Sequence, residues 1–224
     1  MVMSFFRRGE TGIEAIATRT VAMIGDARHS FDLASAALLS GADPEAVGAD
    51  VRDTDERINR AEQEMRGELV VHAAVHGTEN IAVVMSYTLL IKKIERIGDQ
   101  AKNILDLADE GVSLAGEPDS DILLAHRRTI SAMMSETADL LNDPDEERVA
   151  DFRERADTLR RELETHIRGY MHSDEPASFA VPRAILYRYW KRIVANLAGV
   201  ITSVTEPLQH QGYLDDGDTD IADD

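Results

Sequence analysis

The chain has 224 residues, of which 43% are hydrophobic, carries a formal net charge of -18 and contains no cysteine. This length can bury a sizeable core, either in one large domain or in two small ones. The absence of cysteine excludes disulfides, thiolate zinc sites and cysteine nucleophiles, and it is compatible with a reducing compartment. The acidic charge opposes binding to nucleic acid or to an anionic membrane surface. No apolar segment approaches the roughly 18 residues of a membrane span, and the N-terminus lacks the features of a signal peptide, so we expect a cytoplasmic protein without membrane insertion.

The first half of the sequence predicts three helices. Residues 10–40 are alanine-rich, contain no proline and repeat apolar residues at helical spacing. Asp43 as N-cap and Pro44 at the first helical position predict a second helix that runs to about His76, where Gly77 ends it. A third helix, with Thr78 as a potential cap, is expected from about residue 80 to Glu110.

The second half predicts three more helices after a loop over residues 111–119. The first of them covers about 120–141. For the next, which extends to about residue 171, Asp143 would be the cap, Pro144 the first helical residue and Glu146 the third. The last begins between Asp174 and Pro182 and ends near residue 206, and Pro182 should either restart or kink it.

These elements predict an all-α fold of two antiparallel three-helix bundles related by an internal repeat, because the connections are short and strand signals are absent. We expect the first bundle at residues 10–112, the second at 118–210, and a disordered acidic tail at 211–224. The exposed faces of such bundles are compatible with a homodimer.

A polar column on the third helix is the first candidate for chemistry. Glu95, Asp99 and Asn103 follow one another at four-residue spacing beside an apolar stripe. Carboxylates at this spacing repel each other, so the column requires a nearby positive charge. That charge could be a metal ion, or the column could be a solvated ridge neutralised by the basic residues Lys92, Arg96 and Lys102.

The second helix carries a matching polar strip of Asp55, Asn59 and Glu62 near its apolar seam. If the two helices pack antiparallel, this strip can face the column on the third helix. Four carboxylates and two amides would then suit iron, manganese, magnesium or calcium, and zinc if water or imidazole completes the shell. The predicted metal ligands are thus drawn from six residues: Asp55, Asn59, Glu62, Glu95, Asp99 and Asn103.

The sequences DERINRAE at 55–62 and IERIGDQAKNI at 94–104, together with the six-helix layout, resemble the PhoU family of phosphate-signalling regulators. The resemblance covers roughly residues 11–210 and is strongest in the first half. It implies two three-helix bundles that can bind metal, with iron, zinc, magnesium and manganese as candidate ions. It also implies a cytoplasmic negative regulator of phosphate uptake whose partners are the ATPase subunit of a phosphate transporter and a sensor histidine kinase.

The second half departs from the motifs of that family. Lys191 and Ala195 stand where Glu95 and Asp99 stand in the first half, and Arg161 stands where Asn59 does. We therefore expect no second metal site of the family type. Instead, Lys191 and Arg161 should pair with the acidic residues Asp157 or Glu164.

Other signals point to weaker alternatives. His72 and His76 have a spacing that can bind zinc on a helix. They lie in the last turn of the predicted helix, however, where the helix dipole alone favours a positively charged imidazolium. A ferritin-like oxidase would need Glu-x-x-His pairs, which are absent, and no catalytic motif occurs, so we expect no enzyme. The remaining alternative is a metal-free helical adaptor of a transporter or kinase.

Overall fold

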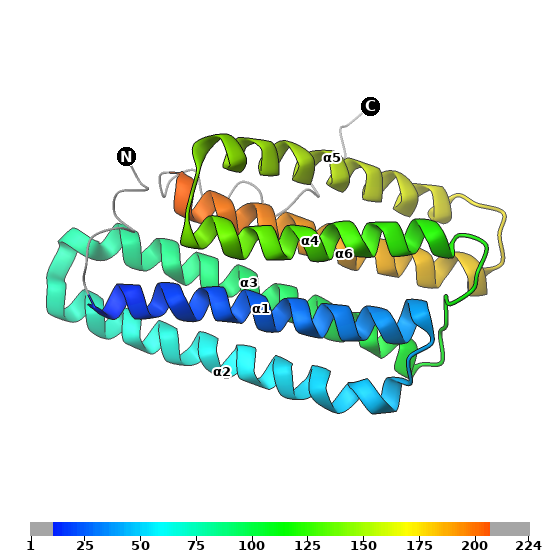
Figure 1. Ribbon diagram of the computed structural model, residues 1–224, viewed down its shortest axis with the longest axis horizontal. Helices are drawn as coiled ribbons and strands as arrows, with labels where there is room; N and C mark the ends of the chain where they lie inside the picture. Colours follow the sequence, from blue (N-terminus) through cyan, green and yellow to red (C-terminus); the bar gives the residue numbers. More distant parts are fainter. Residues whose placement is uncertain (1–10, 207–224) are drawn as a thin grey trace.

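The computed structural model describes residues 11–206, and in this range the chain forms six α-helices, one short 3-10 turn and no strand. The prediction of an all-α fold with two three-helix bundles is confirmed (Figure 1). The predicted acidic tail lies outside the described residues. The elements are α1 (Thr11–Ser40), α2 (Pro44–His76), η2 (Gly77–Asn80), α3 (Ile81–Asp109), α4 (Ser120–Asn142), α5 (Glu146–Met171) and α6 (Ala177–Thr205).

The helices run nearly along the long axis of the molecule, with α1–α3 in one layer and α4–α6 in the other (Figure 1). Within the first bundle α1, α2 and α3 all contact one another, whereas within the second bundle α4 and α5 each contact α6 and contact each other little. The two bundles meet through α3 against α6 and through α1 against α4. One hydrophobic core runs through both, so the division at residues 112 and 118 stays a prediction.

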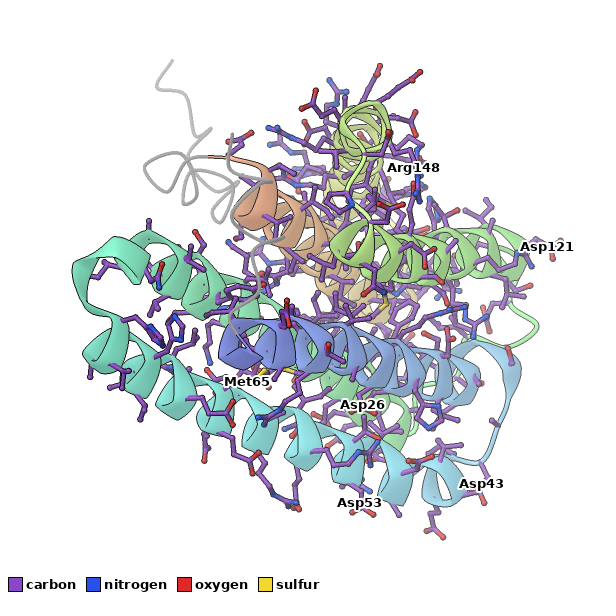
Figure 2. All side chains as sticks on the ribbon, turned by 60° about the vertical axis from the view of Figure 1, so that its left-hand side comes forward. Asp26, Asp43, Asp53, Met65, Asp121 and Arg148 are labelled. Carbon is purple, nitrogen blue, oxygen red and sulfur yellow. The ribbon has the colours of Figure 1, made fainter. Side chains whose placement is uncertain are left out.

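The boundaries of α2 are those that the sequence predicts. Asp43 has extended backbone angles and its side chain accepts a hydrogen bond from the Glu45 amide at 3.0 Å, with Pro44 directly after it. Gly77 ends the helix with φ of 71°, in the left-handed region that favours glycine. The apolar seam on α2 is buried against α1 and α3, whereas charged side chains such as Asp53 cover its outward side (Figure 2).

Two predicted cap residues are wrong. The turn η2 precedes α3, so Asn80 rather than Thr78 is the cap residue of α3. Helix α5 begins at Glu146 with Asp145 as cap, which accepts a hydrogen bond from the Arg148 amide at 2.8 Å. The predicted cap Asp143 instead ends α4, because its amide still bonds back to Asp139 of that helix.

Pro182 does not restart the last helix, because α6 begins five residues earlier, at Ala177, and continues through the proline to Thr205. Pro182 lies past the first turn of α6, so it removes the amide donor that would bond to the Ser178 carbonyl, and the helix continues without that hydrogen bond.

A buried arginine ties the loop between the bundles to α6. Arg183 is only 1% exposed, and its Nε and Nη2 donate to the two carboxylate oxygens of Asp119, each at 2.8 Å. Glu117 accepts from the same guanidinium at 3.2 Å, and the Tyr170 hydroxyl donates to Asp119 at 3.2 Å. The hydrogen bonds from Arg183 lower the pKa of the Asp119 carboxyl. This bidentate pair fixes the start of α4 relative to α6.

We predict that Asp119→Asn lowers the free energy of unfolding by about 3 kcal/mol at pH 7, because it weakens the pairing of a buried guanidinium. A lowered folded pKa means that the Asp119 charge stabilises the fold above the unfolded pKa of about 3.9 and that this contribution is lost as the pH falls through the folded value. The difference from the wild type should therefore shrink in urea unfolding at about pH 3. Asp121→Asn, at an exposed position on α4, is the control. Equal stability of Asp119→Asn and the wild type at pH 7 would contradict this role.

Candidate functional site

Helices α2 and α3 approach closely along the groove where the predicted ligands lie. A Cβ atom built on Gly98 of α3 would lie 3.0 Å from Ile58 Cδ1 of α2, tighter than an ordinary van der Waals contact. Of the predicted ligands, Asp55, Glu62 and Glu95 are 7%, 6% and 9% exposed. The polar strip on α2 and the polar column on α3 thus face a groove that is largely closed to solvent. We call this set of six predicted ligands the acidic groove.

A lysine occupies one part of the acidic groove. Lys102 of α3 reaches across to α2, with its Nζ 2.9 Å from Asp55 Oδ2. The same oxygen accepts a hydrogen bond from Asn59 Nδ2 at 3.3 Å. Hydrogen bonding to Asp55 raises the pKa of Lys102, so the ammonium stays charged there.

A second lysine lies further along the groove. Lys92 Nζ is 2.8 Å from Glu95 Oε2 and 3.8 Å from Glu62 Oε1, which also accepts a hydrogen bond from Arg66 at 3.0 Å. Glu95 Oε2 is buried, and the contact with the Lys92 ammonium lowers the pKa of Glu95 against the larger opposing effect of burial. Within the described residues, Lys92 is the cation that pairs with Glu95.

The remaining two predicted ligands are less constrained. Asp99 is half-buried and makes no ion pair within 4.0 Å among the described residues, and the Asn103 side chain makes no hydrogen bond to any of them. The neutralisation by Lys92 and Lys102 that the sequence suggested is confirmed. In residues 11–206, no three carboxylates of the groove bring their oxygens within 4.8 Å of one another. Metal binding at these six residues stays a prediction.

Electrostatics single out Glu95 and Asp99. Burial is the largest cause that raises the pKa of each carboxyl, and the neighbouring carboxylates of the groove raise both further. Among the described residues these are the two carboxyl groups with a clearly raised pKa, whereas those of Asp50, Asp119 and Glu164 are lowered. The ionised forms of Glu95 and Asp99 are thus destabilised in spite of the two lysines, and an additional cation would relieve them.

We predict that Asp99→Asn stabilises the metal-free protein at pH 7. A raised folded pKa means that the ionised carboxylate costs stability as the pH rises from the unfolded value of about 3.9 to above the folded one. The neutral amide avoids this cost, so the free energy of unfolding should rise at pH 7 and change little near pH 3. Thermal unfolding with a chelator present measures the effect. Asp106→Asn, at an exposed position of the same helix, is the control, and a destabilised Asp99→Asn at pH 7 would contradict the prediction.

Of the two basic residues at the matching positions of the second bundle, one forms the predicted ion pair. Lys191 Nζ lies 2.9 Å from Glu164 Oε2, which confirms the predicted pairing. Burial opposes it, but Arg168 and Lys191 together lower the pKa of Glu164. The prediction for Arg161 is wrong, because its guanidinium donates to Thr158 on its own helix and the adjacent Arg160 pairs with Asp157.

Sequence reasoning missed a different group in the second bundle. His126 of α4 and Glu162 and His166 of α5 place one potential ligand atom each within 4.8 Å of one another. The four-residue spacing of Glu162 and His166 was a usable signal, but nothing in the sequence placed His126 opposite them. The rings of the predicted pair His72 and His76 do lie together, with centroids 4.3 Å apart. Within residues 11–206, however, no third His, Asp or Glu brings a ligand atom within 4.8 Å of both.

Comparisons with known proteins agree with the resemblance noted from the motifs. Residues 20–108 match the family model described as the PhoU domain. They cover most of α1, all of α2 and α3 up to Ala108. The structure is similar to the crystal structure of PhoU from Pseudomonas aeruginosa, with a TM-score of 0.72 and 20% sequence identity, over 86% of this chain and 95% of that chain. A search of curated proteins gave no match. In residues 11–206, no helix is long and apolar enough to cross a bilayer.

Proposed function

We propose that the chain is a PhoU-like negative regulator of phosphate uptake and phosphate-responsive signalling, because residues 20–108 match the PhoU domain model and the fold is similar to that of PhoU from Pseudomonas aeruginosa. It acts in the cytoplasm through protein contacts, without catalysis, and binds metal in the first bundle. Its partners are the ATPase subunit of a phosphate transporter and a sensor histidine kinase.

The metal assignment rests on the electrostatic environment of the Glu95 and Asp99 carboxyl groups. Both carboxyl groups have a raised pKa although Lys92 lies 2.8 Å from Glu95 Oε2 and Lys102 pairs with the neighbouring Asp55. A further cation placed between Glu95 and Asp99 would stabilise their ionised forms. The donors of the groove are carboxylate and amide oxygens, which favour iron, manganese or magnesium over zinc, since zinc usually takes nitrogen or sulfur ligands as well.

The two lysines in the groove can give way to such an ion. The side chains of Lys92 and Lys102 are 42% and 37% exposed, so each ammonium can turn from the groove into solvent. When they do, Asp55 and Glu62 become available beside Glu95 and Asp99. Lysine and metal thus compete for the same carboxylates, and metal occupancy would change the charge and the packing between α2 and α3.

The end of the first bundle supplies a surface for the transporter ATPase subunit. Six of the nine large apolar side chains exposed in the described residues lie on the last turns of α2 or the first turns of α3. This end projects beyond α4 and α5, at the left of Figure 1. It also lies within the matched PhoU domain. We call this set the apolar tip: Val70, Val71, Val75, Ile81, Met85 and Leu89.

Apolar side chains gathered at one projecting end are typical of protein contact sites, because a free protein gains nothing by exposing them. The tip belongs to the same two helices as the acidic groove. A metal-dependent change between α2 and α3 could therefore reach the partner directly, along the helices that carry both features.

A metal-free adaptor is the second candidate function. The ion pairs of Lys92 and Lys102 favour it, because they already place two positive charges among the four carboxylates of the groove. Both candidates use the apolar tip for partner binding, and they differ in whether regulation requires Glu95 and Asp99.

We predict that Val71→Lys with Val75→Lys abolishes regulation without unfolding the protein, since both residues are more than 60% exposed. In cells that lack this protein, phosphate uptake at high external phosphate should be elevated, and the wild-type chain should restore repression. The tip variant should fail to restore it, and co-purification with the transporter ATPase subunit should fall at least 10-fold.

Met171→Lys with Val181→Lys is the matched control, because these apolar residues are exposed in the second bundle, at 68% and 51%. Normal repression by the tip variant would contradict the proposed contact. Loss of repression together with conversion of a dimer to a monomer would instead identify the tip as a contact between two copies. Repression that survives Glu95→Gln with Asp99→Asn would favour the metal-free adaptor.

A further inference from the structure

The second bundle contains a cluster that the proposed regulator function does not use. His126 lies on α4, and Glu162 and His166 lie one turn apart on α5. Within residues 11–206 they are the one set of three His, Asp or Glu side chains whose potential ligand atoms all approach within 4.8 Å. We propose that His126, Glu162 and His166 form a binding site for a divalent transition metal ion of the zinc type, here called the histidine site.

The orientation of His126 suits a ligand. Its Nε2 lies 3.0 Å from Glu162 Oε1, and its Nδ1 lies 3.4 Å from the Tyr187 hydroxyl. Without an ion, a proton on Nε2 donates to the Glu162 carboxylate. When an ion binds, this proton leaves, and in the tautomer with the proton on Nδ1 the Tyr187 oxygen accepts its hydrogen bond while Nε2 binds the metal. Histidine ligands of metals are typically oriented in this way, through a hydrogen bond at the other ring nitrogen.

Tyr187 also positions the second histidine. The His166 and Tyr187 rings are stacked, with centroids 4.5 Å apart and planes 12° from parallel, and His166 meets His126 edge-on at 5.4 Å. One buried tyrosine thus orders both imidazoles before any ion arrives.

No cation competes for Glu162. In the described part of the chain this carboxylate makes no ion pair with a lysine or an arginine, in contrast to the carboxylates of the acidic groove. Its side chain is 53% exposed, whereas that of His126 is 8% exposed. The histidine site is therefore built on a buried ligand and is open to solvent on the Glu162 side, where an ion can enter and a water can complete the shell.

The donor set determines the class of ion. Two imidazoles and one carboxylate are a zinc ligand set with a fourth position left open, whereas magnesium and calcium prefer oxygen ligands alone. Tetrahedral zinc with bonds of 2.0–2.1 Å places its ligand atoms about 3.3 Å apart. Small side-chain rotations would bring atoms that already lie within 4.8 Å to that spacing.

Such an ion would join two helices that are weakly connected. Helices α4 and α5 contact α6 far more than they contact each other, and α5 forms the outer edge of the molecule (Figure 1). Its outward side carries charged residues such as Arg148 (Figure 2). A metal at the histidine site would clamp α5 to α4 directly, and binding to the folded state alone would raise the melting temperature.

The single tryptophan of the chain reports on this site. The ring of Trp190 lies 6.0 Å from that of His126 and is fully buried. Titration of the full-length, chelator-treated protein with Co²⁺ should quench Trp190 fluorescence in a saturable way with one equivalent, because a paramagnetic ion at that distance quenches efficiently. Added Zn²⁺ should displace Co²⁺ and restore the emission, and Mg²⁺ should not.

His126→Gln and His166→Asn should each weaken the Co²⁺ affinity at least 10-fold, with folding checked by circular dichroism. Glu162→Gln, at an exposed position, should weaken it as well and does not disturb the core. His29→Gln is the matched control, because His29 is exposed and pairs only with a carboxylate, Asp50, at 2.8 Å. Glu95→Gln with Asp99→Asn should leave the quenching unchanged, which separates this site from the acidic groove.

Absence of quenching in the wild type would overturn the proposal. Quenching that persists in His166→Asn and Glu162→Gln would also overturn it, because the ion would then bind elsewhere near Trp190.

Discussion

The burial of α3 against α1, α2 and α6 is the constraint on which the rest of the structure depends. A helix that contacts three neighbours has little surface left for solvent, so its polar column must be neutralised within the protein. Lys92 and Lys102 supply two charges from α3 itself, and Gly98 lets α2 approach closely enough for them to reach across. Burial, and after it the neighbouring carboxylates, still raise the pKa of Glu95 and Asp99 in spite of these two lysines.

The two bundles solve the same electrostatic problem differently. In the first, buried carboxylates pair with Lys92 and Lys102, whose side chains are 42% and 37% exposed. In the second, Lys191 pairs with Glu164 at the position where the first bundle has Glu95. Among the described residues, the cluster of His126, Glu162 and His166 lies instead on α4 and α5 and includes no lysine or arginine. A metal at the histidine site and a metal in the acidic groove would therefore act on different pairs of helices. Independently of both sites, the Arg183–Asp119 ion pair attaches the loop between the bundles to α6.

Helical periodicity and end signals were sufficient to predict the six helices, because caps such as Asp43 and stops such as Gly77 act within one turn of the chain. They gave the wrong N-cap where two aspartates precede one helix, as Asp143 and Asp145 do before α5. The facing of α2 and α3 followed from their apolar seams. Contacts between helices distant in sequence did not follow, since His126 reaches Glu162 and Tyr187 only through the packing of α4 and α5 on α6. Lysine side chains are long enough to choose among several carboxylates, so the pairing of Lys102 with Asp55 required the structure as well.

Elemental analysis of the purified, untagged, full-length protein tests directly whether the acidic groove holds a metal ion. The measurement uses a His126→Gln, His166→Asn background, so that the histidine site contributes no metal. About one equivalent of iron, manganese or magnesium is expected in this background, and it should be lost when Glu95→Gln and Asp99→Asn are added. Equal metal content with and without those two substitutions, or none in either after soaking with these ions and zinc, would contradict it.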